Sequence, residues 1–287
     1  MTLPKSPYKL ALLRLMRPTN SLMMGIAVVV GEVAIAGHIP SLTQMLLGFI
    51  VSFMLTASAM VTNDIVDLEI DRINEPGRPL PTGRVSVNTA KVFGGLLAAF
   101  GIIAAALLSN YALVIAIATF VVSLTYNIYG KRLGLPGNLM VGFTIAVPFL
   151  FGGIVVSGAI NFTVATFFFL AFLATVGREV VKGIADVIGD EIKGIKTIAR
   201  VYGSMSAAIL ASLFFLVSVS ISPIPFLYGG QGFGYLLIVI VVDAGFVFSS
   251  IYILLHHSKE AALKVKGQAR IWMLLALVAF FVGGLLR

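Results

Sequence analysis

The 287-residue chain has no cysteine, and charged residues make up only 11% of it. The lack of cysteine excludes disulfides and thiolate metal ligands. A soluble domain typically carries about 25% charged residues, so this chain, with a mean hydropathy of +1.04, is an integral membrane protein. The chain has only 12 acidic residues, against 20 lysines and arginines. The positions of the acidic residues are therefore the most informative about a functional site.

Nine apolar stretches predict an all-α protein with nine transmembrane helices. Each stretch reaches or approaches the roughly 20 residues that a helix needs to cross about 30 Å of hydrocarbon. The chain is expected to form one transmembrane domain over residues 1–287. The expected helices are residues 19–37, 42–63, 87–108, 111–129, 138–157, 162–181, 204–222, 233–255 and 270–286.

The basic residues predict the orientation. All lysines and arginines except Arg287 lie in the N-terminal tail or close to the ends of the second, fourth, sixth and eighth stretches, on one side of the membrane. The positive-inside rule makes that side cytoplasmic, with the N-terminus inside and the C-terminus outside. The net positive charge suits anionic lipid headgroups or a phosphorylated ligand and gives no reason to invoke nucleic acid. We expect a multi-pass protein of the cell membrane.

Carboxylates gather in a segment that directly follows the second stretch, residues 63–83. Asp64, Asp67 and Asp71 are spaced i, i+3, i+7, so a continuing helix projects them from one face. A solvated acidic helix end is one interpretation. The other is a magnesium site, because Mg²⁺ favours a few carboxylates together with phosphate oxygens and water. The prolines and glycines after Asp71 predict a structured loop that caps a cavity at the cytoplasmic face.

A second acidic segment, residues 178–200, follows the sixth stretch. Asp186 and Asp190 repeat the i, i+4 spacing of Asp67 and Asp71 at an offset of 119 residues. Four helices separate the two segments, and an even number preserves the chain direction. The sequence therefore predicts two parallel four-helix repeats and one extra helix, at about residues 19–132, 138–255 and 270–286.

Two carboxylate clusters that face each other across a bundle would hold metal ions, and a diphosphate could bridge those ions. Arginines and lysines near each cluster would bind the outer phosphate oxygens. The apolar bundle beyond would receive a hydrocarbon chain. These features predict an enzyme that acts on a diphosphate with an apolar tail. A secondary transporter is the alternative from another class, but its acidic site usually lies near the bilayer midplane rather than at helix ends.

The motifs resemble those of the UbiA superfamily of intramembrane prenyltransferases, and the resemblance covers nearly the whole chain. It implies nine helices, a lateral opening to lipid, and Mg²⁺-dependent transfer of a prenyl group from its diphosphate. The elements that carry the resemblance are Asn63-Asp64-x-x-Asp67-x-x-x-Asp71, Arg78-Pro79-x-Pro81-x-Gly83, Tyr126 with Lys131-Arg132, and Asp186-x-x-x-Asp190.

Within the superfamily, Arg17-Pro18-x-Asn20 and the segment 177–190 resemble archaeal enzymes of ether lipid synthesis. Those enzymes transfer geranylgeranyl from its diphosphate to the free hydroxyl of geranylgeranylglyceryl phosphate, a lipid-like acceptor. The rival acceptor is the aromatic ring of a quinone precursor. Gly183, Ala185 and Ile188 stand where acidic residues are common in the family, which leaves Asp186 and Asp190 as the main ligands of the second segment.

The resemblance also assigns roles to individual residues. The implied magnesium ligands are Asn63, Asp64, Asp67, Asp71, Asp186 and Asp190, and among them Asp67, Asp71, Asp186 and Asp190 are implied to be catalytic. Tyr126 is expected to bind the diphosphate or stabilise the developing cation, and Arg17 to hold the phosphate of the acceptor. The substrate-binding candidates are Arg17, Asn20, Arg72, Arg78, Lys131, Arg178, Lys182 and Lys193.

Overall fold

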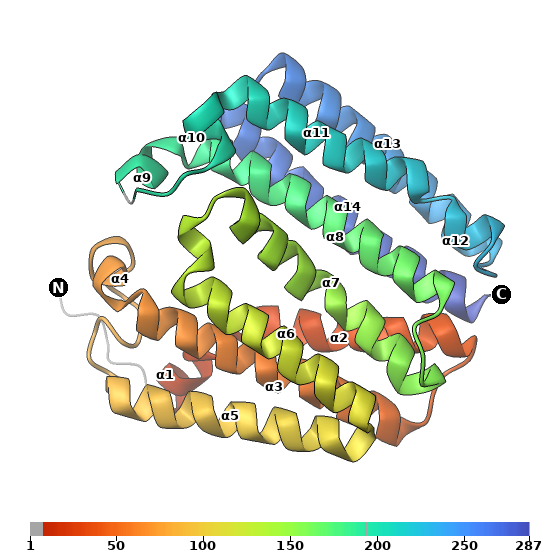
Figure 1. Ribbon diagram of the computed structural model, residues 1–287, viewed down its shortest axis with the longest axis horizontal. Helices are drawn as coiled ribbons and strands as arrows, with labels where there is room; N and C mark the ends of the chain where they lie inside the picture. The colour runs from red at the N-terminus through yellow and green to blue at the C-terminus, as the bar shows by residue number, and fades with distance from the viewer. Residues whose placement is uncertain (1–7, 193, 287) are drawn as a thin grey trace.

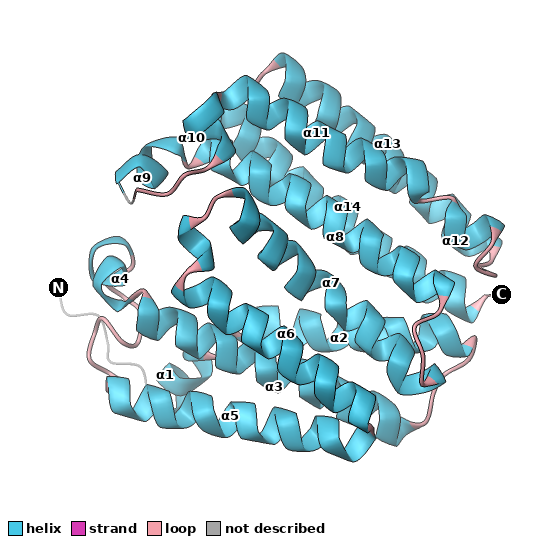
Figure 2. Ribbon diagram, viewed as in Figure 1, coloured by secondary structure: helices cyan, strands magenta, loops and turns pink. Residues whose placement is uncertain are grey.

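The computed structural model describes residues 8–192 and 194–286, and the elements of this part are helices joined by loops (Figures 1 and 2). Nine helical segments in these residues are long and apolar enough to cross a membrane, which confirms the predicted fold class. They are α2 (Pro18–Ala36), α3 (Leu42–Val66), α5 (Val87–Leu108), α6 (Asn110–Ile128), α7 (Leu135–Ser157), α8 (Phe162–Ala185), α11 (Ser204–Ile221) with α12 (Ile224–Leu227), α13 (Phe233–Leu255) and α14 (Lys259–Leu285).

The remaining helices are short; α1 precedes the first long helix, and the others lie between long helices. Figure 1 shows α4, α9 and α10 together at one end of the bundle, which we call the capped end. This arrangement agrees with the loops expected to cover one face of the protein. The short elements are α1 (Tyr8–Leu15), α4 (Leu68–Asn74), the 3-10 turn η1 (Gly130–Arg132), α9 (Val187–Ile192) and α10 (Ile198–Tyr202).

The long helices pack as two groups of four. Helices α2, α3, α5 and α6 form the first group, and α7, α8, α11 and α13 form the second. Contacts of α7 with α2 and α6 join the groups, and α14 packs on α13, α8 and α2. This is the predicted plan of two four-helix repeats plus one helix.

Glycines bring α2 and α7 into close contact where the two groups meet. A Cβ placed on Gly31 would lie 2.7 Å from the carbonyl oxygen of Phe149, and one on Gly152 would meet the carbonyl oxygen of Val28. Without a side chain at either glycine, the backbones approach directly, as is common between membrane helices that lack a hydrophobic driving force for association.

Both acidic segments contain a bend at an aspartate. Helix α3 ends at Val66 and α4 begins at Leu68, while α8 ends at Ala185 and α9 begins at Val187. The residues between them, Asp67 (φ −86°, ψ 5°) and Asp186 (φ −103°, ψ 8°), adopt nearly the same backbone conformation 119 residues apart. On a continuing helix Asp64, Asp67 and Asp71 would share one face, and the bend falls at the second of these residues. Each bend redirects the chain while keeping i→i−4 hydrogen bonds, from Asp67 to Asn63 at 2.9 Å and from Asp186 to Lys182 at 3.1 Å.

The last long helix begins earlier than expected, at Lys259 rather than near residue 270. Its first turns are polar, and hydropathy alone therefore placed them in a loop. They form a helix because Ser258 caps the first turn, accepting from the backbone N–H of Ala261, and because the small apolar residues recur on one face. Those buried residues are Ala261, Ala262, Val265 and Ala269.

We predict that Gly31→Ala lowers the free energy of unfolding by about 1–3 kcal/mol, because an added methyl group must push α7 away. The Tm in detergent should fall by several degrees. Gly95→Ala is the matched control, since a Cβ there has no neighbour within 4 Å and alanine favours the helix. Equal Tm values for the two variants would contradict the close approach of α2 and α7.

Candidate active site

Asp64, in the last turn of α3, has an almost fully buried carboxylate, with only 4% of the side chain exposed. Arg17 donates to its Oδ1 at 2.6 Å and to Oδ1 of Asn63 at 3.2 Å. Arg17 stands between α1 and α2 with a φ of 45°, in the left-handed region. That conformation costs a non-glycine residue about 1–2 kcal/mol, which the ion pair with a buried carboxylate helps to offset. The turn before α2 thus aims this guanidinium at α3.

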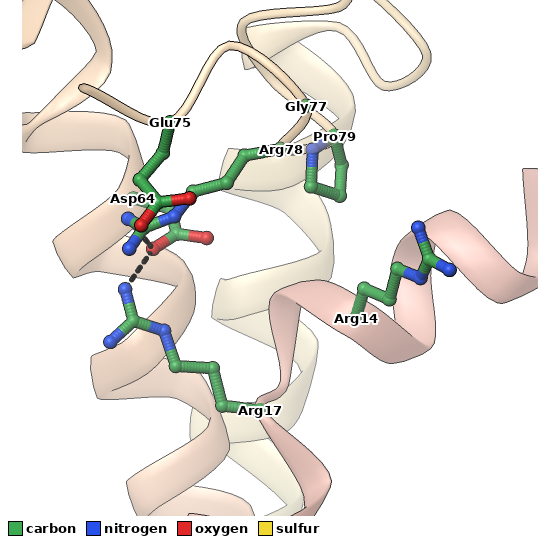
Figure 3. A pocket seen from close by; sticks show the side chains of 7 residues that line it. All are labelled: Arg14, Arg17, Asp64, Glu75, Gly77, Arg78 and Pro79. Atoms are coloured by element: carbon green, nitrogen blue, oxygen red, sulfur yellow. Dashed lines mark hydrogen bonds and ion pairs between the residues drawn. The ribbon is translucent and has the colours of Figure 1, made fainter. Parts of the chain in front are cut away.

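Arg78 reaches the same carboxylate from the loop after α4. Its Nη1 lies 2.6 Å from Oδ2 of Asp71 and 3.4 Å from Oδ1 of Asp64, so one guanidinium joins two carboxylates. Thr82 Oγ1 donates to the Arg78 carbonyl at 2.8 Å and holds the loop. Figure 3 shows Arg17 and Arg78 approaching Asp64 in a pocket of about 290 Å³. The proline-rich loop after α4 therefore positions a cation over the first acidic segment.

Asp67, at the bend between α3 and α4, pairs with Lys131 of η1, whose Nζ lies 2.6 Å from Oδ2. Burial lowers the pKa of Lys131, and the hydrogen bond to Asp67 opposes that shift. The ammonium depends on its carboxylate partner because an isolated charge is costly to remove from water. The end of α6 is thereby tied to the bend.

Asn127 of α6 orients the amide of Asn63. Its Nδ2 donates to the carbonyl of Ala59 at 2.9 Å, and its Oδ1 accepts from Asn63 Nδ2 at 3.1 Å. The oxygen of Asn63 is then left to face Arg17. Asn127 is buried and was not among the predicted residues, because it belongs to no charged pattern in the sequence.

The second acidic segment uses a different ion pair. Glu179 lies on α8 before the bend at Asp186. Its carboxylate accepts hydrogen bonds from Arg178 Nη1 at 2.8 Å and from Lys182 Nζ at 3.3 Å. Asp190 follows one turn after that bend. Sequence reasoning overlooked Glu179 as a site residue, although its spacing of seven residues from Asp186 places it on the same helix face.

One cavity of about 1480 Å³ joins the two segments. Asp67 and Asp186 both line it, so the segments meet over a shared space, as the repeat predicted. Away from these two segments, whose charged side chains form what we call the rim, the lining is mostly apolar, as at Val28, Leu55 and Phe149. Asp243 and a few serines and threonines also line this part. The polar lining includes Asn63, Asp67, Asp71, Arg78, Tyr126, Lys131, Arg132, Arg178, Glu179, Lys182, Asp186 and Asp190.

The other predicted residues are divided between this cavity and its surroundings. Arg17 and Asn20 line the cavity from the start of α2, and Asp64 lies beside it in the smaller pocket. Arg72 is not among the lining residues and pairs instead with Glu69 on an exposed face, at 2.8 Å. Lys193 lies outside the described residues.

The oxygen donors that line the cavity suit a hard divalent cation whose coordination shell is completed by oxygen atoms of the substrate. Carboxylate and amide oxygens are ligands that Mg²⁺ accepts, and it usually keeps only one or two carboxylates alongside phosphate and water. Among the described residues, no group of three or more acidic or histidine side chains is close enough to hold a metal ion. Arg78 and Lys131 pair with Asp71 and Asp67, so a metal ion at the first segment would share these carboxylates with the two cations.

This fold, with paired aspartate bends above an apolar cavity, is that of a membrane prenyltransferase. The chain belongs to the UbiA prenyltransferase family, whose pattern matches residues 24–283. The predicted superfamily is therefore confirmed.

Two curated relatives of the chain carry the same name. A protein of Archaeoglobus fulgidus named digeranylgeranylglyceryl phosphate synthase is 37% identical over 283 residues, covering 96% of each chain. A protein of Thermococcus kodakarensis with the same name is 35% identical, covering 96% of this chain and 99% of its own.

Solved structures agree on the fold. A structure described as digeranylgeranylglyceryl phosphate synthase in membranes has a TM-score of 0.87 at 32% identity and covers 97% of this chain and 99% of its own. A UbiA homologue from Archaeoglobus fulgidus bound to DMAPP and Mg²⁺ has a TM-score of 0.71 at 18% identity, covering 94% of this chain and 99% of its own. At that identity the second structure supports the fold alone.

We predict that Arg78→Met lowers the free energy of unfolding by about 1.5–3 kcal/mol, because it leaves two buried carboxylates without their shared donor. Chemical or thermal unfolding in detergent measures the change. Arg72→Met is the matched control: its ion pair is exposed, so we expect a change within about 0.5 kcal/mol. A loss of equal size in both variants would mean that Arg78 does not link Asp64 and Asp71.

Proposed function

We propose that this protein transfers a geranylgeranyl group from its diphosphate to the free hydroxyl of geranylgeranylglyceryl phosphate, as in archaeal ether lipid synthesis. The observation that carries the proposal is the single cavity with two aspartate bends at its rim and an apolar interior. The shared name of the curated relatives supports this acceptor over an aromatic one. The position of the charges at helix ends argues against transport.

The metal in this proposal is Mg²⁺. Asn63, Asp67 and Asp71 would hold one ion, and Asp186 and Asp190 another, directly or through water; Asp64 assists by holding Arg17 and Arg78 in place. Bound Mg²⁺ supplies charge neutralisation that makes diphosphate a better leaving group. The donor chemistry of the rim suits this ion, and the homologue bound to DMAPP and Mg²⁺ shares the fold.

The cations at the rim bind the diphosphate in this scheme. Lys131 and Arg78 are held at the cavity by Asp67 and Asp71, and Lys182 lines the same cavity from α8. Fixed cations at the position where negative charge develops stabilise the transition state with little reorganisation. Arg178 also lines the rim, and Tyr126 lies where it can contact the diphosphate or the developing allylic cation.

The apolar walls support a role in binding hydrocarbon and excluding water. Pockets for drug-sized ligands usually measure about 300–1,000 Å³, so about 1480 Å³ leaves room for the tails of two lipid-like substrates. The bond between the prenyl C1 and the diphosphate oxygen breaks, and the acceptor hydroxyl oxygen forms the new ether bond. Its proton passes to the released diphosphate or to a rim carboxylate. A dry wall protects the allylic cation from water.

The function is tested with purified protein. Geranylgeranyl diphosphate and geranylgeranylglyceryl phosphate with Mg²⁺ should give the diether, and EDTA should abolish the reaction. Asp67→Asn and Asp186→Asn should each reduce turnover by a factor of 100 or more, since each removes a rim charge from one of the two bends. Product is measured by mass spectrometry.

Two outcomes would reject the proposal. Prenylation of an aromatic quinone precursor in preference to the glyceryl phosphate would replace the acceptor, while full activity with EDTA or in either asparagine variant would remove the metal scheme. Unchanged Tm values in both variants show that a loss of activity is chemical rather than structural.

We also propose that the capped end faces the cytoplasm, with the N-terminus inside and the C-terminus outside, because nearly all cationic residues lie toward that end. The absence of cysteine permits a direct test with single-cysteine variants. Ile188 of α9 and Ile160, between α7 and α8, are exposed by 70% and 60%. In intact cells a membrane-impermeant maleimide should label Ile160→Cys and leave Ile188→Cys unlabelled until the cells are opened. The reverse pattern would invert the topology.

A further inference from the structure

Arg270 of α14 is an exposed cation in the cavity lining. Within the part of the chain that the structure describes, neither a hydrogen bond nor an ion pair is found for its guanidinium, whereas most lining cations are paired with carboxylates. Arg132 shares this property, but it directly follows Lys131 at the aspartate rim. Arg270 therefore presents a separate positive charge on another wall of the cavity.

The packing of α14 against α2 places Arg270 at the level of the rim. At the far end of the two helices a Cβ on Gly284 would lie 2.6 Å from Cα of Ala34, so these residues are at the same depth. Helices α2 and α14 are the first and ninth spans, and because both are odd-numbered they cross in the same direction. Arg270 lies fourteen residues before Gly284, and Asn20 lies fourteen residues before Ala34. Both Arg270 and Asn20 line the cavity. At 1.5 Å per residue they lie at about the same depth.

Apolar side chains of α2 and α14 line the cavity below Arg270 and Asn20. Met23 of α2 and Leu274 of α14 both line the cavity, yet they are 39% and 41% exposed. These apolar side chains, on two helices that pack against each other, form one edge of the cavity. Arg270 stands one turn before Leu274 on that edge. The apolar edge and the cation next to it match the hydrocarbon tail and the phosphate of a lipid.

Arg17, the residue predicted to bind the acceptor phosphate, is already committed elsewhere. Its guanidinium is held by the buried Asp64 at 2.6 Å and by Asn63 at 3.2 Å. Asp64 is the most deeply buried of the paired carboxylates, so drawing Arg17 away to a phosphate would cost more than drawing a cation from Asp67 or Asp71. Arg270 can bind a phosphate without breaking any such contact, and a guanidinium binds phosphate through two parallel hydrogen bonds.

We propose that Arg270 binds the phosphate of the acceptor lipid at the edge of the cavity formed by α2 and α14. The assignment rests on the proposed function and names a subsite of the same cavity. The acceptor's hydrocarbon chain lies along the exposed apolar edge at Met23 and Leu274, and its free hydroxyl points inward to the rim. The prenyl diphosphate uses the aspartate rim, so the two anionic groups occupy separate cationic sites.

The test separates the two substrates kinetically. Arg270→Gln should raise the KM for geranylgeranylglyceryl phosphate at least ten-fold and change the KM for geranylgeranyl diphosphate less than two-fold. Arg270→Lys should restore part of the acceptor affinity. Lys266→Gln is the matched control, because it removes the same charge from α14 at a residue that does not line the cavity. It should leave both KM values unchanged.

A second measurement identifies the phosphate as the recognised group. Wild-type protein should prefer geranylgeranylglyceryl phosphate over geranylgeranylglycerol, and Arg270→Gln should lose most of that preference. The assay in a glycosidic detergent free of phospholipid distinguishes acceptor binding from anchoring to bilayer headgroups, since only acceptor binding keeps the KM effect there.

The outcomes also distinguish this inference from the proposed function. Wild-type protein that fails to prenylate the glyceryl phosphate overturns the function itself. Wild-type activity combined with an unchanged acceptor KM in Arg270→Gln overturns only the subsite. An equal rise in both KM values, or an effect that needs phospholipid, would likewise overturn it.

Discussion

Pairing of charge at the capped end is the constraint on which this structure depends. Carboxylates at the end of an apolar bundle repel one another and lose water, so each needs a cation nearby. Arg17, Arg78 and Lys131 come from three different segments and meet Asp64, Asp71 and Asp67 within 2.6 Å. These contacts draw α1, the proline-rich loop and the end of α6 to the end of α3. The same contacts keep cations beside the position where a diphosphate would bind.

The duplicated plan is not symmetrical in charge. At the offset of 119 residues, Lys182 stands where the first segment has Asn63, and Gly183 stands where it has Asp64. The second segment therefore has fewer oxygen donors and contains its own ammonium, which pairs with Glu179. The carboxylates of the first segment pair partly with cations from other parts of the chain. In the second segment Glu179 pairs with Arg178 and Lys182 of its own helix. The two halves of the site thus bring different chemistry to one cavity.

Much of the site could be read from the chain because intramembrane charge is rare. With nine of 12 acidic residues in two segments, Asp67, Asp71, Asp186 and Asp190 were identifiable from position alone, and the structure places them around one cavity. Asn127 could not be found in this way, since a single amide has no periodic pattern. Arg72 looked equivalent to Arg78, yet only Arg78 lies on the loop that folds back over the bend.

The sequence by itself determined the class, the helices and the doubling, because hydropathy over about 20 residues and the spacing of scarce carboxylates are local properties of the chain. The tertiary structure decided which cation meets which carboxylate, and that the last helix begins at Lys259 and carries Arg270 into the cavity wall. Those outcomes depend on how helices distant in the chain pack against one another. No local pattern records that packing.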